Sequence, residues 1–221
     1  MSSRPLPLFP LGTVLLPGSP LPLRVFEPRY RALVADLLEQ PAGDRGFGVV
    51  AIHEGHEVGE SGVRAMYDVG CLALVTDITP APDGTITVLS VGTTRFKVTS
   101  VDHARPYLTA TVEWLDEPVC ESGPLSIAVG RRYAEYVAVL ASLHGRAPET
   151  PELPPDARQL SYLVAAAVVA TVPDRQGFLE EATTTARLEG LLGWLRRETM
   201  LLRRLSAVPS TGLLGAPLSL N

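Results

Sequence analysis

The residues best suited to hold a metal ion form a short polar run, HEGHE, from His53 to Glu57. Two imidazoles and two carboxylates could ligate zinc, but the H-E-x-x-H motif needs histidines four residues apart on a helix. Here they are three residues apart and follow a predicted strand. We interpret the run as a solvated loop and assign no metal ligand and no cofactor-binding residue.

Lysine-dependent chemistry has one candidate residue, because the chain has 18 arginines and a single lysine, Lys97. No G-x-x-x-x-G-K-[ST] loop, no strand-linked G-x-G-x-x-G and no G-x-S-x-G elbow is present. A Ser-Lys dyad would depend on Lys97, which we place on the exposed side of a strand. The histidines, His53, His56, His103 and His144, lie in predicted loops or at element ends. The sequence therefore predicts a non-enzymatic protein with no catalytic residue.

The strongest binding candidate is the run Arg24-Val-Phe-Glu-Pro-Arg-Tyr30, which gathers two arginines, a glutamate and two aromatic residues at a strand–helix junction. Arg24, Phe26, Arg29 and Tyr30 are the candidate peptide-binding residues. A structural interpretation competes with this one. In it Phe26 and Tyr30 are core residues, Glu27 caps the helix, and the arginines are paired with neighbours.

Composition limits the partners and the compartment. The chain is 46% hydrophobic and 19% charged, with a net charge of −5 and no basic run, which disfavours a nucleic-acid partner. No apolar run reaches about 18 residues, and prolines interrupt the N-terminal apolar segment, so neither a membrane span nor a secretory leader is expected. We expect a cytoplasmic protein. Cys71 and Cys120 are expected to be buried free thiols, although a disulfide between them stays open.

Elements in the first part of the chain alternate between short strands and turns, with a single helix. We predict strands at 6–11, 21–26, 47–53, 70–78, 85–91, 95–101 and 107–115, and a loop at 54–66. The helix starts at Pro28, and its apolar residues follow i, i+3, i+4, i+7 spacing from Tyr30 to Leu38. In the strand at 107–115, Leu108, Ala110, Val112 and Trp114 are predicted to share one face. About seven strands around one helix indicate a small mixed barrel in residues 1–118.

The hydrophobic period then changes to that of helices. We predict helices from 123, from 156 to 172, from 173 to about 181, and from about 184 to 205, and hence a helical bundle in residues 119–205. The remaining segment, 206–221, has no charged side chain. It could pack on its own helices or in a groove of a neighbouring copy. The predicted fold class is α+β, a β pseudo-barrel with one packed helix followed by a C-terminal helical bundle.

Several segments resemble those of one known family. The sequences PLFPLGTVLLPG at 7–18 and LPLRVFEPRYR at 21–31 resemble the opening of the Lon protease N-terminal substrate-binding domain. The segments 70–75, 91–96 (VGTTRF), 106–110 and 160–164 and the long last helix extend the similarity over about residues 5–205. Leu16 departs from the family, which commonly has an aromatic residue there.

This resemblance implies a PUA-like β pseudo-barrel followed by a helical bundle, and a role in recognising unfolded or tagged protein substrates. The ATPase and Ser-Lys peptidase of Lon lie beyond this region, so the chain resembles a free-standing substrate-binding-domain protein. We expect a non-catalytic module that binds unfolded or extended polypeptide and works with a protease or a chaperone as partner. The alternative is a small-molecule or RNA-binding protein that uses the PUA-like barrel.

Overall fold

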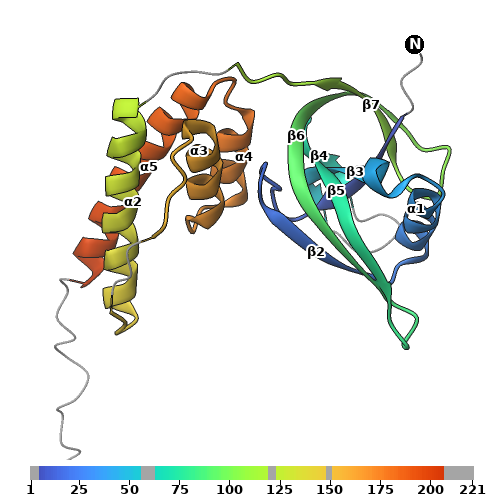
Figure 1. Ribbon diagram of the computed structural model, residues 1–221, viewed down its shortest axis with the longest axis horizontal. Coiled ribbons are helices and arrows are strands. Elements are labelled where there is room, and N and C mark those ends of the chain that lie inside the picture. The colour runs from blue at the N-terminus through green and yellow to red at the C-terminus, as the bar shows by residue number, and fades with distance from the viewer. Residues whose placement is uncertain (1–4, 56–62, 119–122, 148–150, 207–221) are drawn as a thin grey trace, which may run out of the picture.

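The chain forms a β-rich region followed by a helical region (Figure 1). The computed structural model describes residues 5–55, 63–118, 123–147 and 151–206. The seven strands are β1 (Leu6–Leu11), β2 (Pro20–Val25), β3 (Gly46–Gly55), β4 (Val63–Met66), β5 (Val69–Pro80), β6 (Ile86–Asp102) and β7 (Thr109–Trp114). The helices are α1 (Pro28–Leu38), a 3-10 turn (Ala42–Asp44), α2 (Gly123–Leu143), α3 (Ala157–Ala167), α4 (Val172–Glu180) and α5 (Thr184–Ser206). The predicted α+β class, with a barrel before a helical bundle, is confirmed.

Five strands close into a ring in the order β1-β7-β6-β5-β3, because β1 pairs with β7 on one side and with β3 on the other. The β1–β3 pair is parallel, with Leu8 opposite Gly48, and the other pairs of the ring are antiparallel. β2 pairs with the first part of β6, and β4 pairs with the end of β3. Ring closure satisfies the backbone groups that an open sheet would leave unpaired.

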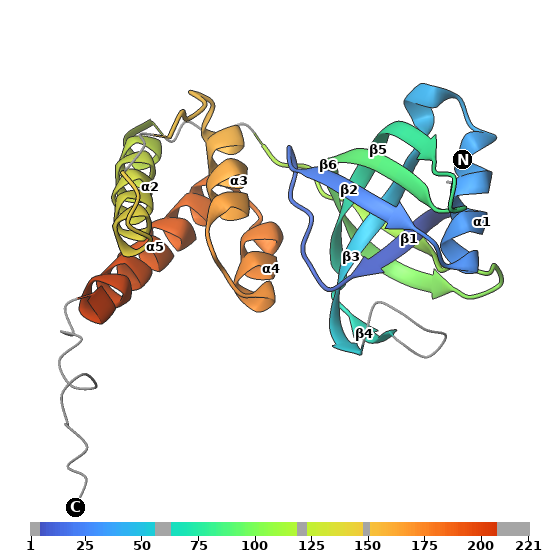
Figure 2. The same cartoon turned by 90° about the horizontal axis from the view of Figure 1, so that it is seen from below.

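Helix α1 packs on the barrel because its apolar residues recur at helical spacing. Tyr30, Leu33, Val34 and Leu37 are buried, and they belong to a core that also contains residues of the helical region. Both views place α1 on the side of the barrel that faces away from helices α2 to α5 (Figures 1 and 2). The barrel therefore has one side toward α1 and another toward the helical region.

The helical region is held together mainly by α5, which packs against α2, α3 and α4. Asp156 caps α3 by accepting a hydrogen bond from the Gln159 amide, and Thr171 caps α4 by accepting one from the Asp174 amide. The α4 helix packs on β5, where Gln176 Nε2 donates to the carbonyl of Val69 at 3.0 Å. This contact is one of several that join the two regions.

Several sequence predictions about elements are wrong in detail. The predicted strands at 85–91 and 95–101 are one 17-residue strand, β6, and the predicted loop at 54–66 contains β4. The helix predicted to reach Val172 ends at Ala167. The predicted alternation of β7 is confirmed, because Leu108, Ala110 and Val112 belong to one apolar cluster and Trp114 contacts Phe96 of the same cluster. The exception on the opposite face is Thr109, which is buried.

Gly92 explains why β6 continues through the predicted break. Its amide donates to the Ser19 carbonyl at 2.9 Å, and its carbonyl accepts from the Gly18 amide at 2.8 Å. A Cβ at position 92 would lie 2.4 Å from the Leu16 carbonyl oxygen, so only glycine lets the segment before β2 approach this closely. The Gly-Thr-Thr sequence therefore marks a close backbone contact within one continuous strand.

Cys71 is a buried free thiol on β5, as predicted, and Cys120 lies outside the described residues. Burial raises the pKa of the Cys71 thiol to about 12. Among the described helices, none combines the length and the apolar character that crossing a bilayer requires.

Candidate functional site

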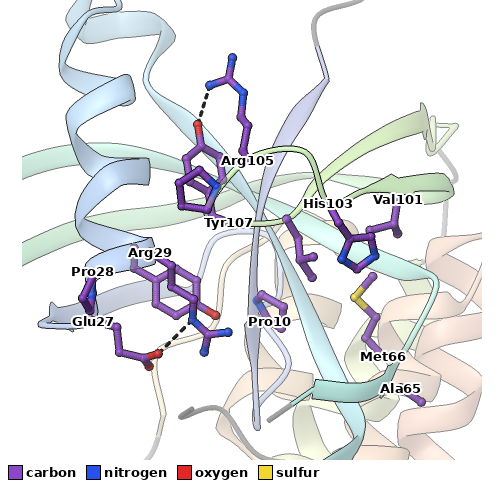
Figure 3. Close-up of a pocket in the computed structure, with 13 residues that line it drawn as sticks. Pro10, Glu27, Pro28, Arg29, Ala65, Met66, Val101, His103, Arg105 and Tyr107 are labelled. Carbon is purple, nitrogen blue, oxygen red and sulfur yellow. Dashed lines mark hydrogen bonds and ion pairs between the residues drawn. The ribbon is translucent and has the colours of Figure 1, made fainter. Parts of the chain in front are cut away.

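Two of the hollows in the described part of the chain are large enough to enclose part of a ligand, and the first lies beside α1. This barrel pocket has a volume of about 770 Å³. Its walls come from Pro10, the start of α1, the end of β4 and the loop between β6 and β7 (Figure 3). Tyr30 stacks on Phe9 with ring centroids 3.9 Å apart, so its ring is fixed by the core beneath.

The charges of the barrel pocket are already paired. Arg29 Nε donates to Glu27 Oε2 at 2.9 Å, and the Arg29 guanidinium lies 4.5 Å from the centroid of the Tyr30 ring. Arg105 Nη1 donates to the Tyr107 hydroxyl at 2.8 Å and also bonds Asp36. Burial is the main cause that raises the pKa of Tyr107, whose hydroxyl donates to Asp36. The pocket thus offers paired charges at its rim and an aromatic ring.

The four predicted peptide-binding residues do not form one site. Arg29 and Tyr30 line the barrel pocket. Arg24 is exposed on β2, where Nη2 donates to Asp83 Oδ2 at 2.6 Å, and Phe26 is 56% exposed; neither lines this pocket. Peptide binding by these residues stays a prediction.

The structural interpretation of the same run is confirmed in part, since Tyr30 is a core residue and both arginines are paired with carboxylates. Two parts of it are wrong. Phe26 is not a core residue, and Glu27 occupies the N-cap position of α1 without a side-chain capping bond. Its carboxylate turns to Arg29 instead.

The second hollow, the junction groove, lies between the barrel and α3 and has a volume of about 1230 Å³. Four segments line it: residues 17–20, residues 92–95 of β6, residues 115–118 after β7, and α3 with Pro154. The apolar part of the lining is Pro17, Pro20, Leu115, Pro118, Pro154, Leu163, Ala166 and Ala167. Leu163 is 39% exposed, so a large apolar side chain of α3 is open to a ligand in the groove.

A buried carboxylate, Glu117, holds the two walls of the groove together. The Glu117 side chain is 6% exposed and lies in the connection between β7 and α2. Arg187 of α5 binds it through two bonds, Nη1 to Oε1 at 2.9 Å and Nη2 to Oε2 at 3.0 Å. The hydroxyls of Tyr162 and Thr184 also donate to this carboxylate. Such a bidentate arginine–carboxylate pair fixes the relative orientation of the two side chains as well as the distance between them.

Arg95 connects this cluster to the barrel. Its Nη2 lies 3.5 Å from Glu117 Oε2, while Nη1 donates to the carbonyls of Leu179 at 2.7 Å and Glu181 at 2.6 Å. The Arg187 guanidinium lies 3.7 Å from the centroid of the Tyr162 ring, and Arg187 Nε donates to the Phe178 carbonyl. Burial raises the pKa of Tyr162 and lowers that of Arg187. The base of the groove is therefore a cluster of charged side chains that are almost fully buried and paired with one another.

Sequence reasoning missed the Glu117 cluster. Arg187 falls in the apolar face of α5, between Thr184, Leu188 and Leu191, where a charged residue is out of place unless it has a buried partner. A charged residue at this apolar position therefore indicates from the sequence that Arg187 has a buried partner. Nothing in the sequence around Glu117 indicated that its carboxylate was that partner, because the two residues are 70 positions apart.

The HEGHE run forms no described metal site. His53 Nδ1 lies 4.0 Å from Glu54 Oε1, both side chains are exposed, and His56 and Glu57 lie outside the described residues. In the part of the chain that the structure describes, no three His, Cys, Asp or Glu side chains are grouped to hold an ion.

Comparison with protein families gives one matching model, the ATP-dependent protease La (LON) substrate-binding domain, over residues 5–197. Among curated proteins, Lon protease 1 of Herpetosiphon aurantiacus is 29% identical over 204 residues, which cover 87% of this chain and 24% of that protein. Lon protease 2 of Myxococcus xanthus is 26% identical over 93% of this chain and 25% of its own length. The chain thus spans about a quarter of the length of these relatives.

Solved structures agree with the family match. A Lon N-terminal domain protein from Xanthomonas campestris superposes with a TM-score of 0.62 at 29% identity, covering 87% of this chain and 99% of that one. The N-terminal domain of the Mycobacterium avium complex Lon protease has a TM-score of 0.59 at 15% identity, covering 87% and 98%. At that identity the second comparison supports the fold alone.

Proposed function

Because this chain belongs to the family of Lon substrate-binding domains, we propose that it is a non-catalytic module that binds unfolded or extended polypeptide in the junction groove. The observation that carries the proposal is the groove itself, an open hollow of about 1230 Å³ with an apolar lining on a rigid floor. The small-molecule or RNA alternative has no comparable support from the family match.

The lining suits an extended chain without sequence preference. Four prolines and Leu115 present apolar surface whose backbone offers few donors, and Leu163 supplies an exposed anchor. Ser19, Thr93, Thr94 and Gln159 add hydrogen-bonding groups along the same walls. Apolar pockets with a few polar groups are the usual form of a ligand site.

The rigid floor lowers the cost of binding. Glu117, Arg95 and Arg187 hold barrel and helices in one arrangement, so a ligand meets walls that are already placed. Preorganised walls cost less conformational entropy on association than walls that must order.

The test uses fluorescence anisotropy with labelled neutral peptides, selected from an array that spans an unfolded protein. We expect the double variant L163D/A166D to bind at least about tenfold more weakly, because it places two charges on the groove wall. The matched control is V169D, which alters an apolar side chain that is 74% exposed and does not line the groove. Equal losses in both variants, or no binding by the unaltered chain, would refute the proposal.

A protease or a chaperone is the expected partner, because the Lon relatives carry the matching segment as about a quarter of a longer chain. Affinity capture with the unaltered chain and with L163D/A166D separates partners that need the groove from those that do not.

A further inference from the structure

A third hollow gathers positive charge on the helical region. It has a volume of about 310 Å³ and lies where α2 and α5 pack against each other. It is lined by Arg132, Arg196, Thr199, Met200, Arg203 and Arg204. None of these residues lines the junction groove or the barrel pocket. No long basic run marks this hollow in the sequence, because Arg132 comes from α2 and the arginines of α5 occur as two short pairs, 196–197 and 203–204.

We propose that this arginine hollow docks a carboxylate-rich, extended segment of a partner protein. Its lining is strongly unbalanced in charge, because it contains four guanidinium groups and no carboxylate among the described residues. Glu135 lies beside it, 2.7 Å from Arg132 and 4.0 Å from Arg203. Glu198 of α5 does not line the hollow. Burial is the main cause that raises the pKa of the neighbouring Tyr136, and the charge of Glu198 adds to this shift. The imbalance occurs in a chain whose net charge is −5, so it is a local feature.

The spacing of the arginines fits a peptide. Arg196, Met200, Arg203 and Arg204 follow i, i+4, i+7, i+8 spacing and lie on one face of α5 over about 12 Å. An extended chain places every second side chain on one side, at intervals of about 6.6 Å. Acidic residues at alternate positions over about five residues therefore match the length of the hollow. The planar guanidinium fork binds carboxylates in a bidentate manner.

Apolar surface within the hollow favours a polypeptide over a polyphosphate or nucleic acid. Met200, which lines the hollow, is 47% exposed. A flexible thioether adapts to varied side chains, whereas a phosphate backbone gains nothing from it. Affinity for nucleic acid comes mainly from neutralising many phosphates along an extended basic surface. This hollow is small and the rest of the chain is acidic.

The test is fluorescence anisotropy with a labelled peptide of sequence Gly-Glu-Ser-Glu-Ser-Glu-Gly at low ionic strength. We expect R196Q/R204Q to lose at least about tenfold in affinity, since two charge-assisted donors are removed. Both side chains are exposed, so the variant should fold. The control R31Q/R146Q makes the same change of charge at exposed arginines outside the hollow and should bind normally. Binding should weaken as salt rises through about 0.1 M.

Further arms separate this proposal from the junction groove and from other occupants. L163D/A166D should bind the acidic peptide with unchanged affinity. A loss of binding in one variant therefore tests the junction groove or the arginine hollow, but not both. Equal affinity of R196Q/R204Q and the unaltered chain would overturn the proposal, as would tighter binding of an oligothymidylate with the same number of charges. A dimer in sedimentation velocity that R196Q/R204Q abolishes would show instead that a second copy occupies the hollow.

Discussion

The barrel pocket and the junction groove use the same kinds of residue in opposite ways. In the barrel pocket, Glu27 and Arg29 pair at the rim with side chains 16% and 23% exposed. In the junction groove, Glu117 and Arg187 pair beneath the surface at 6% and 0% exposed. Because the Glu27–Arg29 pair is partly exposed, either side chain can interact with water or a ligand instead at little cost in free energy. Glu117 and Arg187 cannot, because a buried charge that loses its counter-charge is strongly destabilising. The barrel pocket can therefore rearrange its charged groups around a ligand, whereas the walls of the junction groove are held in place by a buried ion pair.

Removing one carboxylate from each hollow gives the largest contrast. Glu117→Gln leaves Arg95 and Arg187 buried without a counter-charge and should lower the free energy of unfolding by about 3–5 kcal/mol. Glu27→Gln should cost at most about 1 kcal/mol, because its pair is nearer the surface and it makes no capping bond. Urea unfolding monitored by circular dichroism measures both. Similar losses in the two variants would show that the two pairs are equally important.

Gly92→Ala tests the edge of the groove without touching a charge. The new methyl group would meet the Leu16 carbonyl oxygen, so one of the two backbone segments must move. We expect a loss of about 1–3 kcal/mol, the usual cost of overpacking. Gly43→Ala is the control, since a Cβ there meets nothing within 4 Å and Gly43 is not one of the residues that line the groove. An unchanged free energy of unfolding for Gly92→Ala would show that the backbone segment before β2 can move at little energetic cost.

A smaller effect is expected at the two tyrosines that donate to carboxylates. Tyr162→Phe should cost about 1.5–3 kcal/mol, because its hydroxyl bonds a charged group in a nearly dry cluster. Tyr107→Phe should cost less, about 0.5–1.5 kcal/mol, since Asp36 keeps solvent and Arg105 as partners. Thermal and urea unfolding of both variants ranks them. The opposite ranking would place the more rigid cluster in the barrel pocket.

The smallest effect is on alkaline stability. The pKa values of Tyr162 and Tyr107 are raised above the ordinary value of 10.0, mainly by burial. The unfolded chain therefore loses these protons first, so stability present below about pH 10 is lost as pH rises further. Tyr162→Phe should flatten this decline more than Tyr107→Phe. Unfolding free energies measured on either side of pH 10 check the difference, and identical slopes would contradict it.

The sequence by itself determined the family and the fold class. The pattern from Pro7 to Tyr30 and the change of hydrophobic period after residue 118 depend on local chain order, which the sequence contains directly. The buried positions of α1 followed from helical spacing. Strand ends were less certain, because pairing partners such as β2 and β5 decide where β6 continues, and that information is not local.

Only the tertiary structure decided which residues meet. Arg29 and Tyr30 adjoin a pocket while Arg24 and Phe26, a few residues away, do not, because side chains along a strand and at a helix start point in different directions. Glu117 and Arg187 become a buried pair, and arginines of α2 and α5 become one basic hollow, through packing between distant segments. Composition gives the net charge of a chain, but its local charge depends on which surfaces the fold brings together.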